Sequence, residues 1–256
     1  MCNQLIINNM KVKIKNLKPN PYRKIENYPV DEMKVLALVN SIEQTGFWDN
    51  ILARKADGEI QIAYGHHRLE ALKRVMSPED EVDIPVKELD DATMIKVMAT
   101  ENMEHWAVTP AIIDQTVKVT REFLLNHPEI AQEYGEVHKS SATAENMIGA
   151  VLIARFLGWK QQKITDSLER LHLVSIGRIN QLTIECFDTE GSARTFVDVI
   201  KEQEELGEPI PKEKHMEIVR KFRESGNSKQ VLKEIVEDTV YERPKFNSEK
   251  GQDIRI

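Results

Sequence analysis

The sequence has little cysteine and no long apolar run. Its two cysteines, with no Cys-x-x-Cys pair, exclude a disulfide framework and a cysteine-based zinc site. Its most apolar segment, 147–154, falls far short of the roughly 20 residues that a spanning helix needs, so no membrane segment is expected. The first ten residues lack an apolar leader core. We therefore expect a reduced, cytoplasmic protein without a membrane partner.

The charge balance is acidic. The chain carries 35 basic and 42 acidic residues, for a net charge of −7, which argues against a polyanion-binding surface over the whole molecule. A local basic face is still compatible with that total. The hydrophobic share of 41% is enough to bury a core, which excludes a largely disordered chain.

The first 90 residues alternate between strand and helix patterns. A strand is predicted over 12–17 and is ended by Pro19-Asn20-Pro21, because proline cannot donate to a sheet. A helix is predicted to open at Asp31 and to end at Gly46. The remaining predictions are strands over 51–54 and 60–64 joined by Asp57-Gly58, a helix over 68–76 and a strand over 84–89.

After residue 91 the pattern is helical, so the predicted class is α+β. Helices are predicted over 92–103, from Thr109-Pro110 to about 126, within 143–184, over 216–224 and over 229–237, and a loop or short helix over 129–141. The predicted domains are a small mixed domain over 10–106, a helical domain over 107–190, a helical region over 191–243 and a disordered tail over 244–256.

The segment from Tyr64 to Arg68 lies between a predicted strand and a predicted helix. A helix start exposes backbone N–H groups, and Gly65 lets an anion approach them closely. His66, His67 and Arg68 would add donors, which favours a phosphate site. The same pattern opens many helices whose polar residues are simply solvated. From these residues alone both interpretations stay open.

Four segments in order resemble the N-terminal domain of the ParB/sulfiredoxin superfamily. They are Leu17–Arg23, Ser41–Phe47, Tyr64–Ala71, and Glu101–Glu104 followed by Thr109-Pro110. The resemblance covers about residues 12–125 and, more loosely, the helices that follow.

The resemblance implies a nucleoside triphosphate and magnesium. On this mapping Gly65, His66, His67 and Arg68 bind phosphates, and Arg23 approaches the nucleotide. Glu101 and Asn102 hold the magnesium ion, and Glu101 assists a slow hydrolysis. ParB proteins that clamp on DNA usually carry Gly-Glu-Arg-Arg, whereas this chain has Gly-His-His-Arg. Whether the nucleotide is CTP or ATP therefore stays open.

The Gly-x-His-Arg pattern is closer to sulfiredoxin and to the free-serine kinases of the superfamily, which use ATP or ADP. No cysteine lies near residue 65, which excludes the sulfiredoxin reaction. A serine-kinase activity would need a carboxylate base, and Glu26 is the nearest candidate by position. A metal site of His66, His67 and His105 is disfavoured by spacing, and a nuclease by the lack of a dense acidic cluster.

A helix-turn-helix is predicted from the segment Ile153–Trp159 and a second helix over about 161–171, with the turn at Gly158. The segment 155–178 holds five basic residues against two acidic ones, as a DNA-contacting face requires and as an ordinary amphipathic helix pair can show by chance. The predicted contacts to DNA are Lys160, Gln161, Gln162, Lys163 and Arg170. The second helix is expected to expose the last four of these together with Asp166.

The predicted function is nucleotide-dependent binding to double-stranded DNA, of the partition or transcription-control type, in a plasmid or phage setting. The resemblance implies a homodimer whose open and closed states the nucleotide biases, and a partition ATPase as partner. The alternative is a small-molecule phosphotransferase of the free-serine kinase type.

Overall fold

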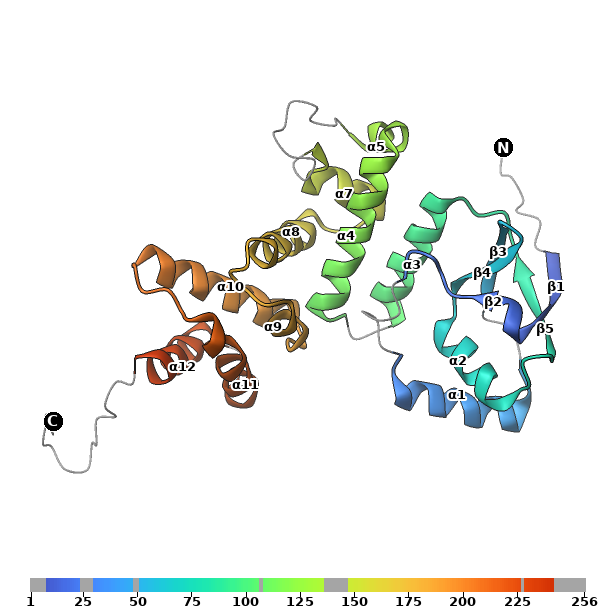
Figure 1. Cartoon of the computed structure of the whole chain (residues 1–256), viewed down its shortest axis with the longest axis horizontal. Helices are drawn as coiled ribbons and strands as arrows, with labels where there is room; N and C mark the ends of the chain where they lie inside the picture. Colours follow the sequence, from blue (N-terminus) through green and yellow to red (C-terminus); the bar gives the residue numbers. More distant parts are fainter. Residues whose placement is uncertain are drawn as a thin grey trace, which may run out of the picture. The chain divides into compact units, whose positions relative to one another are not determined.

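The computed structural model describes residues 8–23, 30–47, 51–105, 108–135, 147–226 and 228–241, without the side chains of residues 8 and 102–105. The chain divides into two compact units. Met1–Ala107 with Gln115–Gln161 make the first, and Val108–Asp114 with Gln162–Ile256 make the second. The first unit holds the whole sheet and the second is helical (Figure 1), which confirms the α+β class. The helix α4 (Pro110–Asn126) gives residues to both units.

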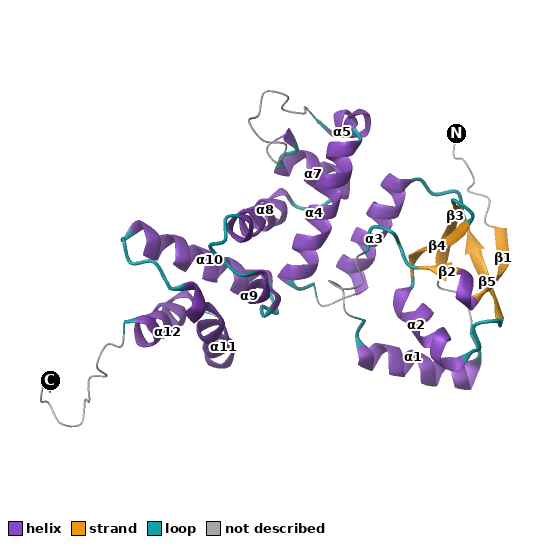
Figure 2. Ribbon diagram, viewed as in Figure 1, coloured by secondary structure: helices purple, strands orange, loops and turns teal. Residues whose placement is uncertain are grey.

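The first unit is built on a mixed five-stranded sheet (Figure 2). The strands lie in the order β1 (Asn8–Lys13), β5 (Glu81–Val86), β3 (Leu52–Ala56), β4 (Glu59–Tyr64) and β2 (Leu17–Lys18). The pairs β1–β5 and β3–β4 are antiparallel, and β3–β5 and β2–β4 are parallel.

The predicted single strand over 12–17 is wrong. The chain leaves β1 through a 3-10 turn, η1 (Ile14–Asn16), before β2 begins. The backbone N–H groups of Ile14 and Lys15 donate to the carbonyls of Asp80 and Pro78, at 3.1 Å each. An alternating apolar pattern does not reveal such a turn, because Ile14 is buried in either conformation.

The predicted hairpin and the first helix are confirmed. Asp57 and Gly58 have φ values of 53° and 80°, the pair of positive angles that a two-residue hairpin turn requires. Asp31 caps α1 (Glu32–Thr45) by accepting the N–H of Met33 at 3.0 Å. Gly46 ends the helix at φ 77°.

Two helices position the end of β4. The helix α2 (His66–Val75) follows β4 after Gly65 and packs Leu69 and Leu72 into the core beneath the sheet. The helix α3 (Asp91–His105) packs against β4 and buries Met94 completely. The strand-to-helix turn at residue 65 is therefore held between the sheet and α3.

The first unit also contains α5 (Pro128–Tyr134), α7 (Ala150–Leu157) and the larger part of α4. Phe123, Tyr134 and Phe156 join these helices through ring contacts. Lys96 of α3 donates to the Tyr134 hydroxyl at 2.6 Å. The predicted loop or short helix over 129–141 begins as α5, and its residues after 135 lie outside the described residues.

The second unit packs its helices around phenylalanines. Its elements are α8 (Gln161–Ser175), α9 (Gln181–Glu185), α10 (Glu190–Glu205), η3 (Lys212–Lys214), α11 (His215–Ser225) and α12 (Lys229–Val240). Phe187, Phe196 and Phe222 lie in the core. The predicted helices over 216–224 and 229–237 are confirmed, and α10 was not predicted. Its first turn contains Gly191 and Ser192, which are poor helix formers.

Within the described parts of the chain, no helix has both the length and the apolar character needed to cross a bilayer. The predicted disordered tail, 244–256, lies outside the described residues.

Candidate functional site: the strand-to-helix turn at Gly65

Asn20 ties the turn after β2 to the rest of the site. Its side chain is buried, and its Nδ2 donates to the carbonyls of Ala63 and Met94 at 3.2 Å each. Its Oδ1 accepts the N–H of Tyr22 at 3.0 Å, and its own N–H donates to Nε2 of His66 at 3.1 Å. One buried amide thus joins the end of β4, the middle of α3 and the start of α2.

The start of α2 has the geometry of an anion site. Gly65 adopts a left-handed conformation (φ 98°, ψ 29°), which strains a residue with a Cβ atom. Its carbonyl accepts the N–H of Leu69 at 3.0 Å, the first bond of the helix. The amides of residues 66–68 precede that bond, so they lie at the positive end of the helix dipole.

The Nε2 atoms of the two histidines are acceptors in this structure, and their predicted role as phosphate ligands stays a prediction. Both are buried, and each Nε2 accepts a backbone N–H, from Asn20 onto His66 at 3.1 Å and from Asp31 onto His67 at 3.2 Å. Burial lowers the pKa of His66, and burial together with the charge of Arg23 lowers the pKa of His67 to about 4. Both rings are therefore neutral at pH 7, as acceptors must be.

The tautomer of His66 follows from this bond. Because Nε2 accepts, the proton of the neutral ring lies on Nδ1, which is 3.6 Å from Oε2 of Glu101. Nη1 of Arg23 lies 3.1 Å from the same Nδ1. Both of these nitrogens are donors and cannot hydrogen-bond each other. Oε2 of Glu101 lies near both of them, and its negative charge keeps Arg23 and His66 close together.

Glu101 of α3 points into the turn. Its Oε1 accepts the Gly65 N–H at 3.1 Å, and its Oε2 lies 3.5 Å from Nη1 of the buried Arg23. Burial raises the pKa of Glu101, but the neighbouring His66, the Gly65 N–H and Arg23 outweigh burial and lower the pKa below its ordinary value. Glu101 is therefore an ionised, internally bonded carboxylate.

The predicted magnesium site stays a prediction. Oε1 of Glu101 accepts the Gly65 N–H, whereas its buried Oε2 has no hydrogen-bond partner among the described residues and lies 3.5 Å from Nη1 of Arg23. In the described chain no three His, Cys, Asp or Glu side chains group together as metal ligands. The side chains of Asn102 and His105, like the whole of Glu26, lie outside the described residues.

Arg68 is the predicted phosphate ligand whose side chain is uncommitted. It lies on the first turn of α2 and is half-buried. Among the described residues its guanidinium meets no hydrogen-bond acceptor and no carboxylate. Of the predicted ligands at this turn, the structure therefore gives Arg23, His66 and His67 internal contacts and leaves Arg68 available.

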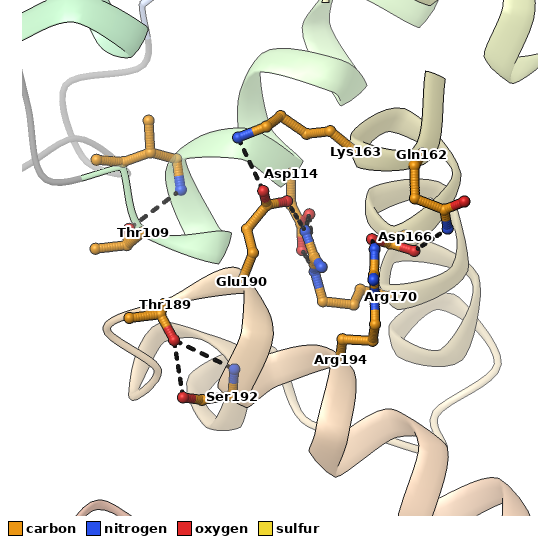
Figure 3. Close-up of polar contacts among 11 residues, drawn as sticks. Thr109, Asp114, Gln162, Lys163, Asp166, Arg170, Thr189, Glu190, Ser192 and Arg194 are labelled. Carbon is orange, nitrogen blue, oxygen red and sulfur yellow. Dashed lines mark hydrogen bonds and ion pairs between the residues drawn. The ribbon is translucent and has the colours of Figure 1, made fainter. Parts of the chain in front are cut away.

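The predicted DNA-contacting helix α8 is less exposed than expected, and for Arg170 the expectation was wrong. Arg170 is buried, and its guanidinium grips the carboxylate of Asp114 through three contacts of 2.6–3.1 Å (Figure 3). Lys163 is partly covered and pairs with Glu190 at 2.8 Å. These residues stabilise the second unit, because breaking a buried pair leaves an uncompensated charge.

The two helices of the predicted helix-turn-helix are present and are separated by a left-handed glycine, Gly158 at φ 70°, while the motif itself stays a prediction. However, α7 belongs to the first unit and nearly all of α8 to the second. Lys160, Gln161 and Gln162 are exposed. Gln162 donates to Asp166 at 2.8 Å.

A second helix pair lies wholly inside the second unit and was missed. The helices α8 and α9 are joined by residues 176–180, with Gly177 at φ 73° and with Ile179 buried. Arg178 in this turn is half exposed, and Gln181 is exposed at the start of α9. Gly177 followed by Arg178 was the available signal, but the apolar spacing over 143–184 pointed to continuous helix.

The stability of the first unit is expected to depend on pH through His67. The neutral ring is favoured in the folded state, so its contribution is complete above about pH 6.5 and is lost as the pH falls towards about 4. His67→Gln retains an acceptor for the Asp31 N–H without titrating. We expect urea unfolding of this variant to show a smaller loss of stability between about pH 7 and about pH 5 than the parent.

The matched control is His172→Gln, which changes an exposed histidine of α8. The control should keep the parental pH profile. Equal profiles for the parent and His67→Gln would contradict a neutral, accepting His67.

The comparisons with known proteins agree with this architecture. The ParB N-terminal domain family matches residues 3–103. A probable chromosome-partitioning protein ParB of Xylella fastidiosa is 28% identical over 139 residues, which cover 54% of this chain and 43% of that protein. The chromosome-partitioning protein Spo0J of Thermus thermophilus is 22% identical over 139 residues, which cover 54% of this chain and 50% of that protein. The matched part thus spans half or less of these relatives.

A solved structure supports the fold. A Pnob8-like ParB-N domain superposes with a TM-score of 0.53 at 12% identity, covering 94% of this chain and 97% of that one. The family match includes β2, the Gly65 turn and Glu101, so it contains the whole polar site described above. Residues 3–103, which are less than half of the chain, therefore match the ParB N-terminal domain family.

Proposed function

We propose that this chain is a nucleotide-dependent DNA-binding protein of the ParB partition type. Its N-terminal domain binds the phosphates of a nucleoside triphosphate at the start of α2, and the helical part of the chain binds a duplex. The observation that carries the proposal is the Gly65 turn itself. A left-handed glycine precedes the free end of a helix, and Arg68 stands beside it with an uncommitted guanidinium.

The buried contacts around this turn support the proposal. Asn20 fixes the turn to β4 and α3 without using the amides at the start of α2. A phosphate site needs donors that are held in place before the ligand arrives, because ordering them afterwards costs affinity. The preference for CTP or ATP remains a prediction.

The described residues give less support to phosphotransfer. A serine kinase needs a carboxylate that accepts a proton from the acceptor hydroxyl, and a pKa near the working pH suits that task. Glu101 has a lowered pKa and already accepts the Gly65 N–H. We therefore assign Glu101 no step in hydrolysis or transfer. The homodimer and the partition ATPase partner follow from the resemblance alone and stay predictions.

For DNA, we propose two separate candidate contacts, which are the exposed start of α8 in the first unit and the turn before α9 in the second. Lys160 and Gln161 lie at the start of α8. Arg178 lies in the turn before α9, and Gln181 is the first residue of α9. Arginine and glutamine at the start of a helix can contact phosphates and base edges. Arg170 is left out of this proposal because Asp114 holds it in the core of the second unit.

Arg68→Ala is expected to weaken nucleotide binding. The variant loses a charge-assisted contact, so affinity for the bound triphosphate should fall by about 2 kcal/mol, or roughly 30-fold. Calorimetric titration with CTP, ATP, ADP and GTP measures this and identifies the base in the same experiment. Free serine added with ATP or ADP tests for phosphoserine, which the proposal does not expect.

Arg74→Ala is the matched control. Arg74 lies at the far end of α2 and pairs with Glu32 on the surface, so its removal should leave nucleotide affinity unchanged. Equal affinities for the parent and Arg68→Ala would mean that the Gly65 turn only begins a helix.

Lys160→Ala and Arg178→Ala are expected to separate the two candidate DNA contacts. A duplex is first selected from a random-sequence library, and its affinity is then measured by fluorescence anisotropy at several salt concentrations. A residue that contacts phosphate should reduce the slope of log K against log salt by about 1 when it is removed. Arg223→Ala on α11, paired with Asp188, is the control. If both variants keep the parental slope of log K against log salt, the duplex does not contact either residue.

A further inference from the structure

Lys96 of α3 places its ammonium group against two aromatic rings. Its Nζ lies 4.8 Å from the ring centre of Tyr134 and 4.7 Å from that of Phe156, and it donates to the Tyr134 hydroxyl at 2.6 Å. Within the described chain Lys96 forms no ion pair with a carboxylate. A partly buried ammonium loses hydration, and the electron-rich ring faces offset that loss. The contact therefore depends on the positive charge as well as on the apolar stem.

The two rings belong to helices that follow α3 in the first unit. Tyr134 is the last residue of α5, and Phe156 lies in α7 and is buried. Their rings meet edge to face, with centres 5.2 Å apart, and Nη1 of Arg155 donates to the Tyr134 carbonyl at 3.2 Å. These contacts hold α5 and α7 together, and Lys96 joins the pair to α3.

A second series of contacts also ends at Phe156. Tyr22, in the turn after β2, meets the ring of Phe123 edge to face at 6.1 Å between centres. Phe123 of α4 lies 6.0 Å from Phe156, again between ring centres. Phe156 is thus the point where contacts from α3 and from the turn after β2 meet.

Both series begin at Asn20. Its Oδ1 accepts the N–H of Tyr22 at 3.0 Å, and its Nδ2 donates to the carbonyl of Met94, two positions before Lys96, at 3.2 Å. Its own N–H donates to His66 at the start of α2. All of these residues belong to the first unit. A rearrangement at the start of α2 therefore has a continuous path of contacts to α7.

We propose that Lys96 is a positioning residue, which transmits the state of the Gly65 turn to α7 through Tyr134 and Phe156. This inference rests on the proposed function, because it takes the Gly65 turn as the nucleotide site and α7 as part of the duplex-binding helices. A ligand shifts α7 only if it binds one arrangement of the turn more tightly than another. Loss of the Lys96 charge should then weaken the response of α7 while the nucleotide site itself stays intact.

Lys96→Met in the full chain tests the proposal by amide hydrogen exchange, read by mass spectrometry. The probe is CTP or ATP with magnesium, whichever binds the parent more tightly. In the parent we expect the nucleotide to change exchange over residues 150–157 by at least about three-fold. Methionine retains the apolar stem without the charge, so this change should fall below about 1.5-fold while nucleotide affinity stays within about three-fold of the parent.

Two further variants separate this role from simple packing. Lys96→Arg restores a cation and should recover most of the response of α7. Tyr134→Phe keeps both rings and removes only the hydroxyl that accepts from Lys96, so it should fold and show a reduced response. Recovery with arginine but not with methionine is a result that a merely space-filling Lys96 would not give.

Lys73→Met is the matched control, because Lys73 is a surface lysine of α2 that pairs with Glu70. It should keep the parental response of α7. A parental response in Lys96→Met overturns the proposal. A fall of more than about ten-fold in the nucleotide affinity of Lys96→Met also overturns it, since the residue would then support the nucleotide site itself.

The exchange experiment contains no DNA, so the two proposals fail in different ways. A response of α7 that depends on Lys96, in a protein that binds no duplex, would remove the DNA-binding part of the proposed function and leave this inference standing. Nucleotide binding without any response over residues 150–157 would overturn this inference alone. If the parent binds no nucleotide, both are contradicted.

Discussion

The buried contacts of Asn20 and Glu101 at the start of α2 are the constraint on which the site depends. Asn20 satisfies two carbonyls and one imidazole from three separate elements, and Glu101 meets an amide, an imidazole and a guanidinium. The buried site has low polarity, which strengthens each of these contacts and makes a missing hydrogen bond costly in free energy. The turn at Gly65 is therefore held in one arrangement before any ligand arrives.

In this arrangement the basic side chains fall into two groups. Arg23 and Arg170 are both buried against carboxylates, and each would leave an uncompensated charge if its partner were lost. Arg68 and Lys160 are not committed in this way, and they are the side chains that can meet phosphate from outside. In this chain a basic residue in a suggestive motif is thus as often part of the core as part of a binding surface.

Local signals in the sequence predicted the fold better than the site. The Asp31 cap, the Asp57-Gly58 hairpin and the glycine before α2 each depend on a few neighbouring residues, and each was predicted correctly. The direction of a side chain depends on partners far away in sequence. His66 meets Asn20, and Arg170 meets Asp114, 46 and 56 positions away.

The resemblance to the ParB/sulfiredoxin superfamily brought the right residues together but not their roles. Gly65, Arg23 and Glu101 do lie in one place, as the ordered segments implied. Their charges, however, are balanced internally, which a list of motifs cannot show. The missed pair of α8 and α9 has a similar cause, because the apolar spacing continues through the turn at Gly177.

Backbone amide chemical shifts, recorded by NMR during titration with a nucleoside triphosphate, test the central claim most directly. The account predicts saturable shifts of the Gly65, His66 and Arg68 amides with the triphosphate, and much smaller ones with the matching nucleoside. It would be contradicted if the triphosphate bound while these amides kept their positions in the spectrum.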